Sequence, residues 1–245
     1  MYKFSIVMVC KNSQQTIERS IVSFLNQTYQ NKELIVIDGG SEDDTLKIIQ
    51  KFSKEIYFEN IKGLGLYASI NRGIKKSGGD IIGLLHSDDQ FYDENVLEKI
   101  AEKFNEDLDA IYTNIVFFKK ENKFTRAWNV EKINSLSVKK GIYPPHTGLF
   151  VKKKIFETIG FYNESFKISS DIEFMHKLFE NEVIKKSAFQ INSIKMKIGG
   201  LSTKSPLNII KANFEVYKFY KNNNVKFPLL MILKKMLSKI FQYWR

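Results

Sequence analysis

Two adjacent carboxylates, Asp88 and Asp89, form the most pointed chemical feature of the sequence. They follow His86 and Ser87 at the end of the apolar stretch Asp80–Leu85, which has the length and composition of a buried strand. Neighbouring carboxylates repel each other and are costly to hold at a low-dielectric sheet edge unless a cation compensates their charge. A hard divalent ion such as Mg²⁺ or Mn²⁺ takes oxygen ligands, so the pair predicts such an ion. A solvated loop that caps the next helix is the alternative.

A second acidic cluster, Asp38-Gly39-Gly40-Ser41, follows the strand-like stretch Glu33–Ile37. A carboxylate at a strand end can accept hydrogen bonds from a base or a ribose, and two glycines let the backbone approach a ligand. The alternative is a glycine-rich turn in which Ser41 or Asp44 caps a helix. The sequence contains neither a P-loop nor a dinucleotide-binding fingerprint.

Short apolar stretches alternate with helical periodicity through the first half of the chain. The expected strands are Phe4–Val9, Glu33–Ile37, Ile56–Phe58, Asp80–Leu85 and Ala110–Phe118, and the expected helices include Thr45–Phe52, Ala68–Lys76 and Asn95–Phe104. Such alternation predicts an α/β fold with a mostly parallel central sheet and flanking helices. The second half is less regular, with strands expected at Leu149–Val151 and Phe189–Ile198. In sheets of this kind ligands bind at the carboxyl ends of the strands, where both acidic clusters fall.

Further short motifs extend over roughly residues 3–202. They are Ser5-Ile6-Val7 with Asn12, Ser23–Tyr29, Glu33–Ser41, Gly65-Leu66-Tyr67 with Asn71–Ile74, Gly79–Ile82, Ser87–Asp89, Pro145–Phe150, Gly160-Phe161 and Ile168–Asp171. In this order they resemble the inverting family-two glycosyltransferases of the GT-A (nucleotide-diphospho-sugar transferase) fold, of the type that assembles bacterial cell-surface polysaccharides. An ordered series of motifs is far more specific than any one of them.

The resemblance implies a role for each acidic position. Asp38 would contact the base of the nucleotide with Gly39 beside it, Asp88 the ribose, and Asp89 a Mg²⁺ or Mn²⁺ ion that bridges the diphosphate. Asp171 matches the catalytic base of the family. The implied reaction moves a hexosyl or N-acetylhexosaminyl group from a nucleotide-sugar, a UDP-sugar first, to a saccharide or a lipid-linked saccharide.

The chain departs from the family pattern at three positions. Asp44 stands where the family often has Gly, and Gly63 and Ala68 stand where it often has acids. These differences concern the nucleotide contacts, so the identity of the nucleotide stays open, while the metal and base assignments are unaffected.

The local sequence around Asp171 is compatible with a base. Ser169 or Ser170 is expected to cap a helix that includes Asp171 in its first turn, where the helix dipole stabilises a carboxylate. An acid that merely favours a first turn is the alternative. Glu173 is the rival carboxylate and is expected on a different face of the helix.

Five further residues have weaker signals. His146, after two prolines, and Gly200 and Ser202, in a glycine-rich turn, are candidates for contacts with the acceptor or the diphosphate, by resemblance to family segments. A structural role for His146 and a plain turn at Gly200 and Ser202 are the alternatives. His86 can point toward or away from the acidic pair, and His176 is expected to be solvated.

The positive charge of the chain is concentrated at its C-terminal end. The net charge is +11, yet residues 183–245 contain thirteen Lys and Arg residues and one acid, Glu215, so that residues 1–182 sum to −1. Two regions are therefore expected: a catalytic domain over 1–203 and a basic, amphipathic helical tail over 204–245. No apolar stretch approaches the roughly 20 residues of a membrane span. The single cysteine, Cys10, excludes an internal disulfide and favours a reducing compartment.

The tail has the pattern of a helix that lies in a membrane interface. From Leu229 onward, a spacing of about 100° per residue places Lys234, Lys235 and Lys239 within an arc of roughly 140° that only Met231 interrupts, opposite an apolar side. Cations opposite Leu, Phe and Trp predict binding to an anionic membrane through residues 227–245. We therefore expect a cytoplasmic enzyme at the inner face of the membrane; a tail that packs on the domain with its lysines in water is the alternative.

Two other classes of function remain as alternatives from the sequence. A sugar nucleotidyltransferase also uses acid-held metals, but no basic glycine-rich loop for a triphosphate follows the first strand. A non-catalytic, membrane-associated module that binds nucleotide-sugars predicts that the acids are dispensable. Nucleic-acid binding is not expected, because the aromatic residues of the tail lie on its apolar side and not among its lysines.

Overall fold

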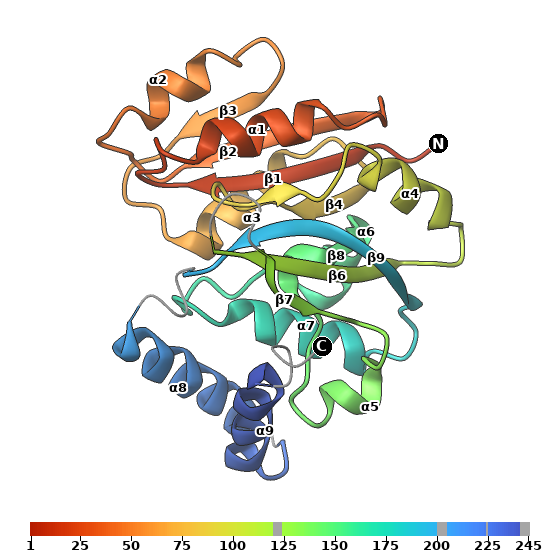
Figure 1. The fold of residues 1–245 in the computed structure, drawn as a ribbon. Helices are drawn as coiled ribbons and strands as arrows, with labels where there is room; N and C mark the ends of the chain where they lie inside the picture. The colour runs from red at the N-terminus through yellow and green to blue at the C-terminus, as the bar shows by residue number, and fades with distance from the viewer. Residues whose placement is uncertain (120–123, 200–204, 224, 241–245) are drawn as a thin grey trace.

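A computed structural model describes residues 1–119, 124–199, 205–223 and 225–240, without the side chains of 238–240. Its strands are β1 (Phe4–Cys10), β2 (Lys32–Asp38), β3 (Tyr57–Asn60), β4 (Ile81–Leu84), β5 (Gln90–Phe91), β6 (Ala110–Phe118), β7 (Phe124–Trp128), β8 (Leu149–Lys152) and β9 (Lys186–Lys197). They form one sheet in the order β3-β2-β1-β4-β8-β6-β9-β5, with β7 paired to β6 (Figure 1). The first four strands are parallel, as are β6 and β9, whereas β8, β5 and β7 pair antiparallel.

The helices cover both faces of this sheet. They are α1 (Ile17–Leu25), α2 (Thr45–Gln50), α3 (Leu66–Lys76), α4 (Val96–Lys103), α5 (Ser135–Val138), the 3₁₀ turn η1 (His146–Gly148), α6 (Lys154–Ile159), α7 (Ser170–Glu180), α8 (Pro206–Asn222) and α9 (Pro228–Ile240). Strand alternation sets the two faces: Phe4, Ile6 and Met8 pack with α1, α2 and α4, and Val7 packs with α3, α6 and α7. The predicted α/β fold with flanking helices is confirmed.

The expected elements of the first half are present with ends shifted by a few residues. The strand β9 begins at Lys186, three residues before the predicted start, because its first residues pair in parallel with the beginning of β6. The sequence did not predict β5, β7 or α6. These are short elements of two to six residues, and so short a stretch shows little periodicity.

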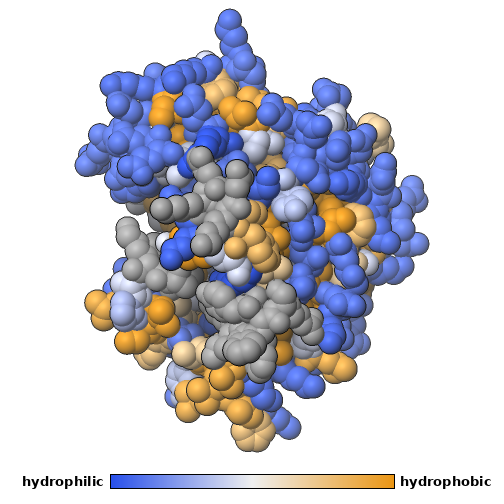
Figure 2. Space-filling view, in the orientation of Figure 1, coloured by the Kyte–Doolittle hydropathy of each residue, from blue (hydrophilic) through white to orange (hydrophobic). Residues whose placement is uncertain are grey.

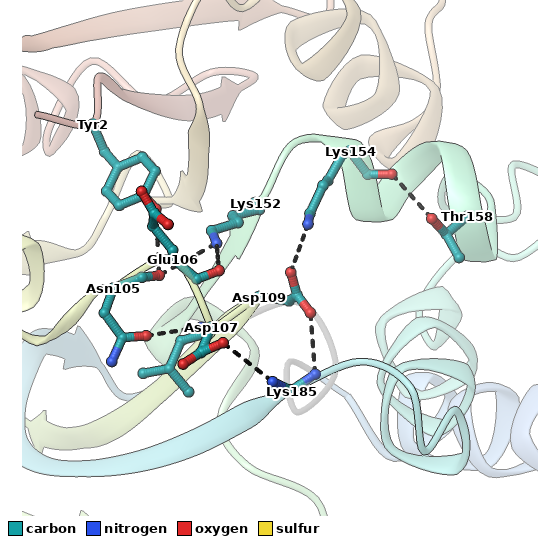
Figure 3. Close-up of polar contacts among 10 residues, drawn as sticks. Tyr2, Asn105, Glu106, Asp107, Asp109, Lys152, Lys154, Thr158 and Lys185 are labelled. Atoms are coloured by element: carbon teal, nitrogen blue, oxygen red, sulfur yellow. Dashed lines mark hydrogen bonds and ion pairs between the residues drawn. The ribbon is translucent and has the colours of Figure 1, made fainter.

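The sheet edge at the beginning of β6 and β9 is held by polar contacts (Figure 3). The carboxylate of Asp109 accepts hydrogen bonds from Lys154 Nζ at 2.9 Å and from the Lys185 backbone N–H at 3.1 Å. Lys152 Nζ donates to the carbonyl oxygens of Asn105 and Glu106. Because β4 and β6 both begin at this edge, it lies opposite the carboxyl ends of β1, β2 and β4.

The two C-terminal helices pack against the domain. Ser205 caps α8, since its Oγ accepts from Asn208 N at 3.2 Å, and Pro206 occupies the first turn. Val216, Phe219 and Tyr220 of α8 are buried in the same core as α3 and α7. The tail is helical as predicted over its described part, and the division at 203/204 stays a prediction. Among the described residues, no helix has the length and apolar character needed to span a bilayer.

Candidate active site at the carboxyl ends of the parallel strands

Asp38 is the last residue of β2 and shapes the loop that follows. It is 0% exposed, and its Oδ1 accepts hydrogen bonds from Gly40 N at 2.9 Å and Ser41 N at 2.8 Å. Its Oδ2 accepts from Ser41 Oγ. The carboxylate thus binds its own loop in the structure, and the predicted contact with a base stays a prediction.

The two glycines of this loop differ in what they require. Gly40 has φ +86°, and a Cβ there would lie 2.9 Å from Lys62 Cα, so only glycine fits without strain. At Gly39 an added Cβ would make ordinary van der Waals contacts, 3.5 Å from Leu64 O at the nearest. Gly39 was the glycine predicted to lie beside the nucleotide, but Gly40 is the position whose backbone conformation requires a glycine.

Asp89 follows β4 with one oxygen unused. The side chain is 1% exposed; its Oδ1 accepts from Lys197 N at 3.1 Å, and its Oδ2 is buried without a hydrogen-bond partner. Burial, and then the neighbouring charge of Asp88, raise the pKa of Asp89 well above its ordinary value. A buried oxygen without a partner is costly, and a cation would both complete it and favour the carboxylate. Asp89 therefore fits a divalent ion; because no three His, Cys, Asp or Glu side chains gather to hold a metal among the described residues, the other ligands would have to come from phosphate and water.

Asp171 lies in the first turn of α7, in the second half of the sequence. The hydroxyl of Tyr67, from α3, lies 3.3 Å from Asp171 Oδ1 and 2.6 Å from the carbonyl oxygen of Ile168. Burial raises the pKa of Asp171, although the charge of Lys235 on α9, the Ile172 N–H and the Tyr67 hydroxyl lower it. Of the two serines expected to cap α7, Ser169 occupies the N-cap position, but its side chain makes no capping bond.

Two neighbouring histidines, His86 and His146, lie in the same region. The His86 and His146 rings have centroids 6.4 Å apart, and His146 Nε2 is 2.8 Å from the Tyr162 hydroxyl. Burial and then His86 lower the pKa of His146 to about 3, so it is neutral at physiological pH. Burial lowers the pKa of His86, while the charges of Asp88 and Asp171 raise it. His86 is therefore near both carboxylates.

The structure brings most of the predicted residues to one edge of the sheet. Ser13 Oγ after β1 lies 2.9 Å from Ser87 Oγ after β4 and joins the two loops. The charges of Asp88 and Asp171 both act on His86, whose ring neighbours that of His146. The charge of Asp88 also acts on Asp89, so these residues form one cluster. Gly200 and Ser202 lie outside the described residues.

The sequence pattern of one family, described as Glycosyl transferase family 2, matches residues 5–174. The chain belongs to this family. It is therefore a glycosyltransferase, and the recognition from the ordered motifs is confirmed. Family membership goes against the two alternatives, a nucleotidyltransferase and a non-catalytic module.

This glycosyltransferase is similar to a mycobacterial and a Campylobacter enzyme, among other relatives. It is 26% identical over 187 residues to a PGL/p-HBAD biosynthesis glycosyltransferase of Mycobacterium bovis, a match that covers 74% of this chain and 71% of the relative. It is 29% identical over 177 residues to the GalNAc(5)-diNAcBac-PP-undecaprenol beta-1,3-glucosyltransferase of Campylobacter jejuni, covering 68% of this chain and 56% of that protein.

Solved structures share the fold of this glycosyltransferase. S. aureus TarS 1–349 in complex with UDP-GlcNAc superposes with a TM-score of 0.71 at 16% identity, over 96% of this chain and 71% of that one. A longer TarS chain is covered to 44%. The mannosyltransferase PcManGT from Pyrobaculum calidifontis, in complex with GDP-Man and Mn²⁺, has a TM-score of 0.64 at 12% identity, over 96% and 69%.

Tyr67 and Tyr162 belong to the site, although the sequence reasoning gave them no role. Tyr67 stands in one of the recognised motifs, Gly65-Leu66-Tyr67, which was the available signal. Its ring stacks on that of Tyr162 with centroids 5.8 Å apart. Tyr162 follows Phe161 of another recognised motif, but nothing local shows that its hydroxyl reaches His146.

The expectation of a solvated His176 is wrong. The side chain is 2% exposed, and its Nδ1 lies 3.0 Å from the Tyr143 hydroxyl. Its ring packs on Phe219 and Tyr220 of α8. The sequence of α7 alone does not show that α8 covers this side.

The rival carboxylate, Glu173, accepts hydrogen bonds from Asn163 Nδ2 at 3.0 Å and from Lys177 Nζ at 2.6 Å. These bonds occupy both of its oxygens, which disfavours it as the base.

Proposed function

We propose that this glycosyltransferase moves a sugar from a nucleotide-sugar, first a UDP-sugar, to a saccharide or a lipid-linked saccharide with inversion at the anomeric carbon. The buried, unpartnered Oδ2 of Asp89 carries the proposal, because it needs a cation and lies in the same cluster as Asp88 and Asp171. Structural neighbours that hold UDP-GlcNAc or GDP-Man support a nucleotide-sugar donor.

In this proposal the loops after β2 and β4 bind the nucleotide. Asp88 binds the ribose, and Asp38 contacts the base. The Asp38 carboxylate already accepts from Gly40 N, Ser41 N, Ser41 Oγ and the Cys10 thiol, so a bond to the base would have to replace one of these, the weak thiol bond first. Its full burial means that the Gly39–Ser41 loop has to shift to admit the base.

Asp89 is the residue that would hold Mg²⁺ or Mn²⁺. When bound, the ion supplies a Lewis acid that stabilises the departing diphosphate. The Mn²⁺ that accompanies GDP-Man in the archaeal mannosyltransferase supports this choice of ion. The Lys197 N–H fixes the carboxylate through Oδ1 and leaves Oδ2 for the ligand role.

Asp171 acts as the base on the acceptor side. As the acceptor oxygen forms its bond to the anomeric carbon and the bond to the diphosphate breaks, the hydroxyl proton passes to Asp171. The Tyr67 hydroxyl orients the carboxylate. His146 is neutral and bonded to Tyr162, so it is suited to a hydrogen bond with the acceptor rather than to carrying charge.

We further propose that α8 and α9 place the enzyme on an anionic membrane, at the cytoplasmic face. Large apolar side chains are exposed on both helices: Leu207, Ile209, Ile210, Phe214, Leu229, Leu230, Leu233, Met236 and Leu237. Figure 2 shows hydrophobic surface gathered over this end of the molecule. Met231, which interrupts the polar arc, is 4% exposed and packs on the domain with Ile232, so the apolar side stays outward.

The names of the relatives support a lipid-linked acceptor. The Campylobacter relative acts on a glycan carried by undecaprenol, and the mycobacterial relative belongs to PGL/p-HBAD biosynthesis. An enzyme held at the membrane surface would meet such an acceptor there, as surface-polysaccharide assembly requires.

The test is release of nucleoside diphosphate from a panel of UDP-, GDP- and dTDP-sugars, with Mn²⁺ or EDTA and with lipid extract as acceptor. We expect metal-dependent turnover of one donor, loss of the metal-stimulated rate in Asp89→Asn, and a fall in kcat of about 10²–10⁴-fold in Asp171→Asn. Asp109→Asn, at the opposite sheet edge, is the control and should keep its rate. Silence across all donors, or equal rates in the Asp89 variant and wild type, would contradict the proposal.

A further inference from the structure

The one acid of the basic C-terminal region, Glu215, faces the segment that leads to Asp171. Glu215 lies on α8 and is half-buried. Its Oε1 accepts a hydrogen bond from Lys167 N at 2.9 Å, and its Oε2 accepts from Ile168 N at 3.0 Å and Ser169 N at 2.9 Å. A single carboxylate therefore collects three consecutive backbone N–H groups through charge-assisted bonds, which are the strong ones.

This clamp holds the residues immediately before α7 and not the N–H groups that a cap would bind. The Oγ of the N-cap residue Ser169 makes no capping bond and instead donates to the carbonyl oxygen of Ala212, also on α8, at 3.0 Å. The segment is thus tied to α8 by both its backbone and its side chain. On its other side, the Tyr67 hydroxyl binds the Ile168 carbonyl oxygen and Asp171 Oδ1.

We propose that Glu215 is a positioning residue for Asp171. Glu215 from α8 holds the three N–H groups of residues 167–169, and Tyr67 from α3 holds the C=O group of Ile168, so two helices fix this segment. Asp171 follows two residues later, so the place of its carboxylate depends on this clamp. The helix α8 then completes the active site rather than only attaching the enzyme to a surface. The inference rests on the proposed role of Asp171 as the base.

The variant Glu215→Gln keeps the shape and removes the charge. Its amide oxygen can accept from one side of the segment, but its NH₂ then faces another N–H donor, and that bond is lost. We expect kcat to fall on the order of 10²-fold, because a displacement of about 1 Å at the reacting group has that effect. The KM for the donor and the affinity for UDP should change little, since the nucleotide loops follow β2 and β4. Glu215→Asp, which keeps the charge on a shorter side chain, should restore part of kcat.

Asp109→Asn is the matched control. Asp109 also joins a backbone N–H to another element, but at the opposite edge of the sheet (Figure 3). Its substitution should lower stability without the loss of kcat. Ser169→Ala, which removes only the bond to Ala212, is a milder second variant and should lower kcat less than Glu215→Gln.

The decisive experiment combines Glu215→Gln with Asp171→Asn and measures kcat of both single variants and the double variant. If Glu215 acts through Asp171, the Glu215 substitution costs little more once Asp171 is absent. A wild-type kcat in both Glu215→Gln and Ser169→Ala would overturn the inference, and so would additive losses in the double variant or an equal loss in Asp109→Asn. A wild-type kcat in Asp171→Asn would instead overturn the base assignment and the inference with it. A wild-type kcat in Glu215→Gln, together with the expected loss in Asp171→Asn, would leave the proposed function intact.

Discussion

At the scale of single residues, Asp171 is balanced between opposing influences. Burial raises its pKa, and Lys235, the Ile172 N–H, Tyr67 and His86 lower it, with burial the larger effect. A base works best with a pKa not far below the working pH, because it must be ionised yet still attract a proton. In the proposed mechanism, burial would strengthen the Asp171 carboxylate as a base, while the Tyr67 hydroxyl of α3 and the charge of Lys235 on α9 would favour its ionised form.

Two substitutions test this balance through the pH profile. Only ionised Asp171 can accept the proton, so the rate should fall as the pH drops through its pKa. Tyr67→Phe and Lys235→Gln each remove an influence that lowers this pKa, so each should move the acid limb of kcat/KM to higher pH. The measurement is kcat/KM between about pH 5 and 9. Lys235→Gln removes a positive charge and leaves the bond to Ile168 in place, so it serves as the check on Tyr67→Phe, which loses that bond. A limb that stays in place or moves to lower pH in Lys235→Gln would contradict the assignment.

The sequence was informative about the residues that share a motif and silent about their distant partners. Asp88, Asp89 and Asp171 could be proposed from motif order, and the structure gathers them with His86. Glu215 could be counted as an isolated acid, but its three bonds reach back nearly fifty residues. Such partnerships depend on how α8 packs, which no local pattern encodes.

At the scale of elements, α3 lies unusually close to β1. A Cβ built on Gly73 would be 2.4 Å from Val7 Cγ1, and Val7 is buried in the core. This contact sets the distance between the helix that carries Tyr67 and the strand at the centre of the parallel sheet. A glycine inside a helix is otherwise unfavourable, so its presence here indicates a packing requirement.

Gly73→Ala should therefore destabilise the protein. Alanine gains roughly 1 kcal/mol in helix propensity, but overpacking a tight core costs about 1–3 kcal/mol and the β-branched Val7 has little freedom to move. We expect a lower urea midpoint with an unchanged m-value. Gly65→Ala, at the N-cap of the same helix where no atom lies within 4 Å of a new Cβ, is the control and should cost less. Equal or higher stability of Gly73→Ala would show that the contact is relaxed in solution.

Periodicity explains which elements were predictable. In β1 the alternation of Phe4, Ile6 and Met8 with Val7 reflects two packed faces, and α3 buries Tyr67, Ile70 and Ile74 at helical spacing. The strand β9 has many partly exposed residues and several lysines, so it was placed only approximately. Its true extent follows from pairing with β6, a contact between segments far apart in the chain.

At the scale of the whole molecule, the positive charge and many of the exposed apolar side chains are concentrated in the C-terminal region. Residues 1–182 have a net charge of −1 and residues 183–245 of +12. The sequence predicted an amphipathic tail, but it could not assign the side that faces the domain. Met231 and Ile232 take that side, and exposed apolar residues of α8 join those of α9. The surface is therefore larger than the one that residues 227–245 alone would present.

Paired substitutions on this surface test membrane docking. In Ile210→Glu combined with Leu233→Glu, two exposed apolar residues, at 65% and 56% exposure, become acidic. Binding to vesicles with anionic lipid should weaken by more than about tenfold, because apolar insertion is lost and each charge near the surface is worth about 1 kcal/mol. Cosedimentation measures it, and high salt should weaken wild-type binding in the same direction.

The control for this experiment is Val183→Glu, which changes an equally apolar residue with 86% exposure in the turn after α7. It should leave vesicle binding near that of wild type. Ile210 and Leu233 are exposed to solvent, so turnover of a water-soluble acceptor should be unchanged in the double variant. Turnover of an acceptor embedded in vesicles should fall. Unchanged sedimentation of the double variant would rule out α8 and α9 as the docking surface. A loss of both activities together would mean that the two helices support the active site only, as the clamp at Glu215 already requires of α8.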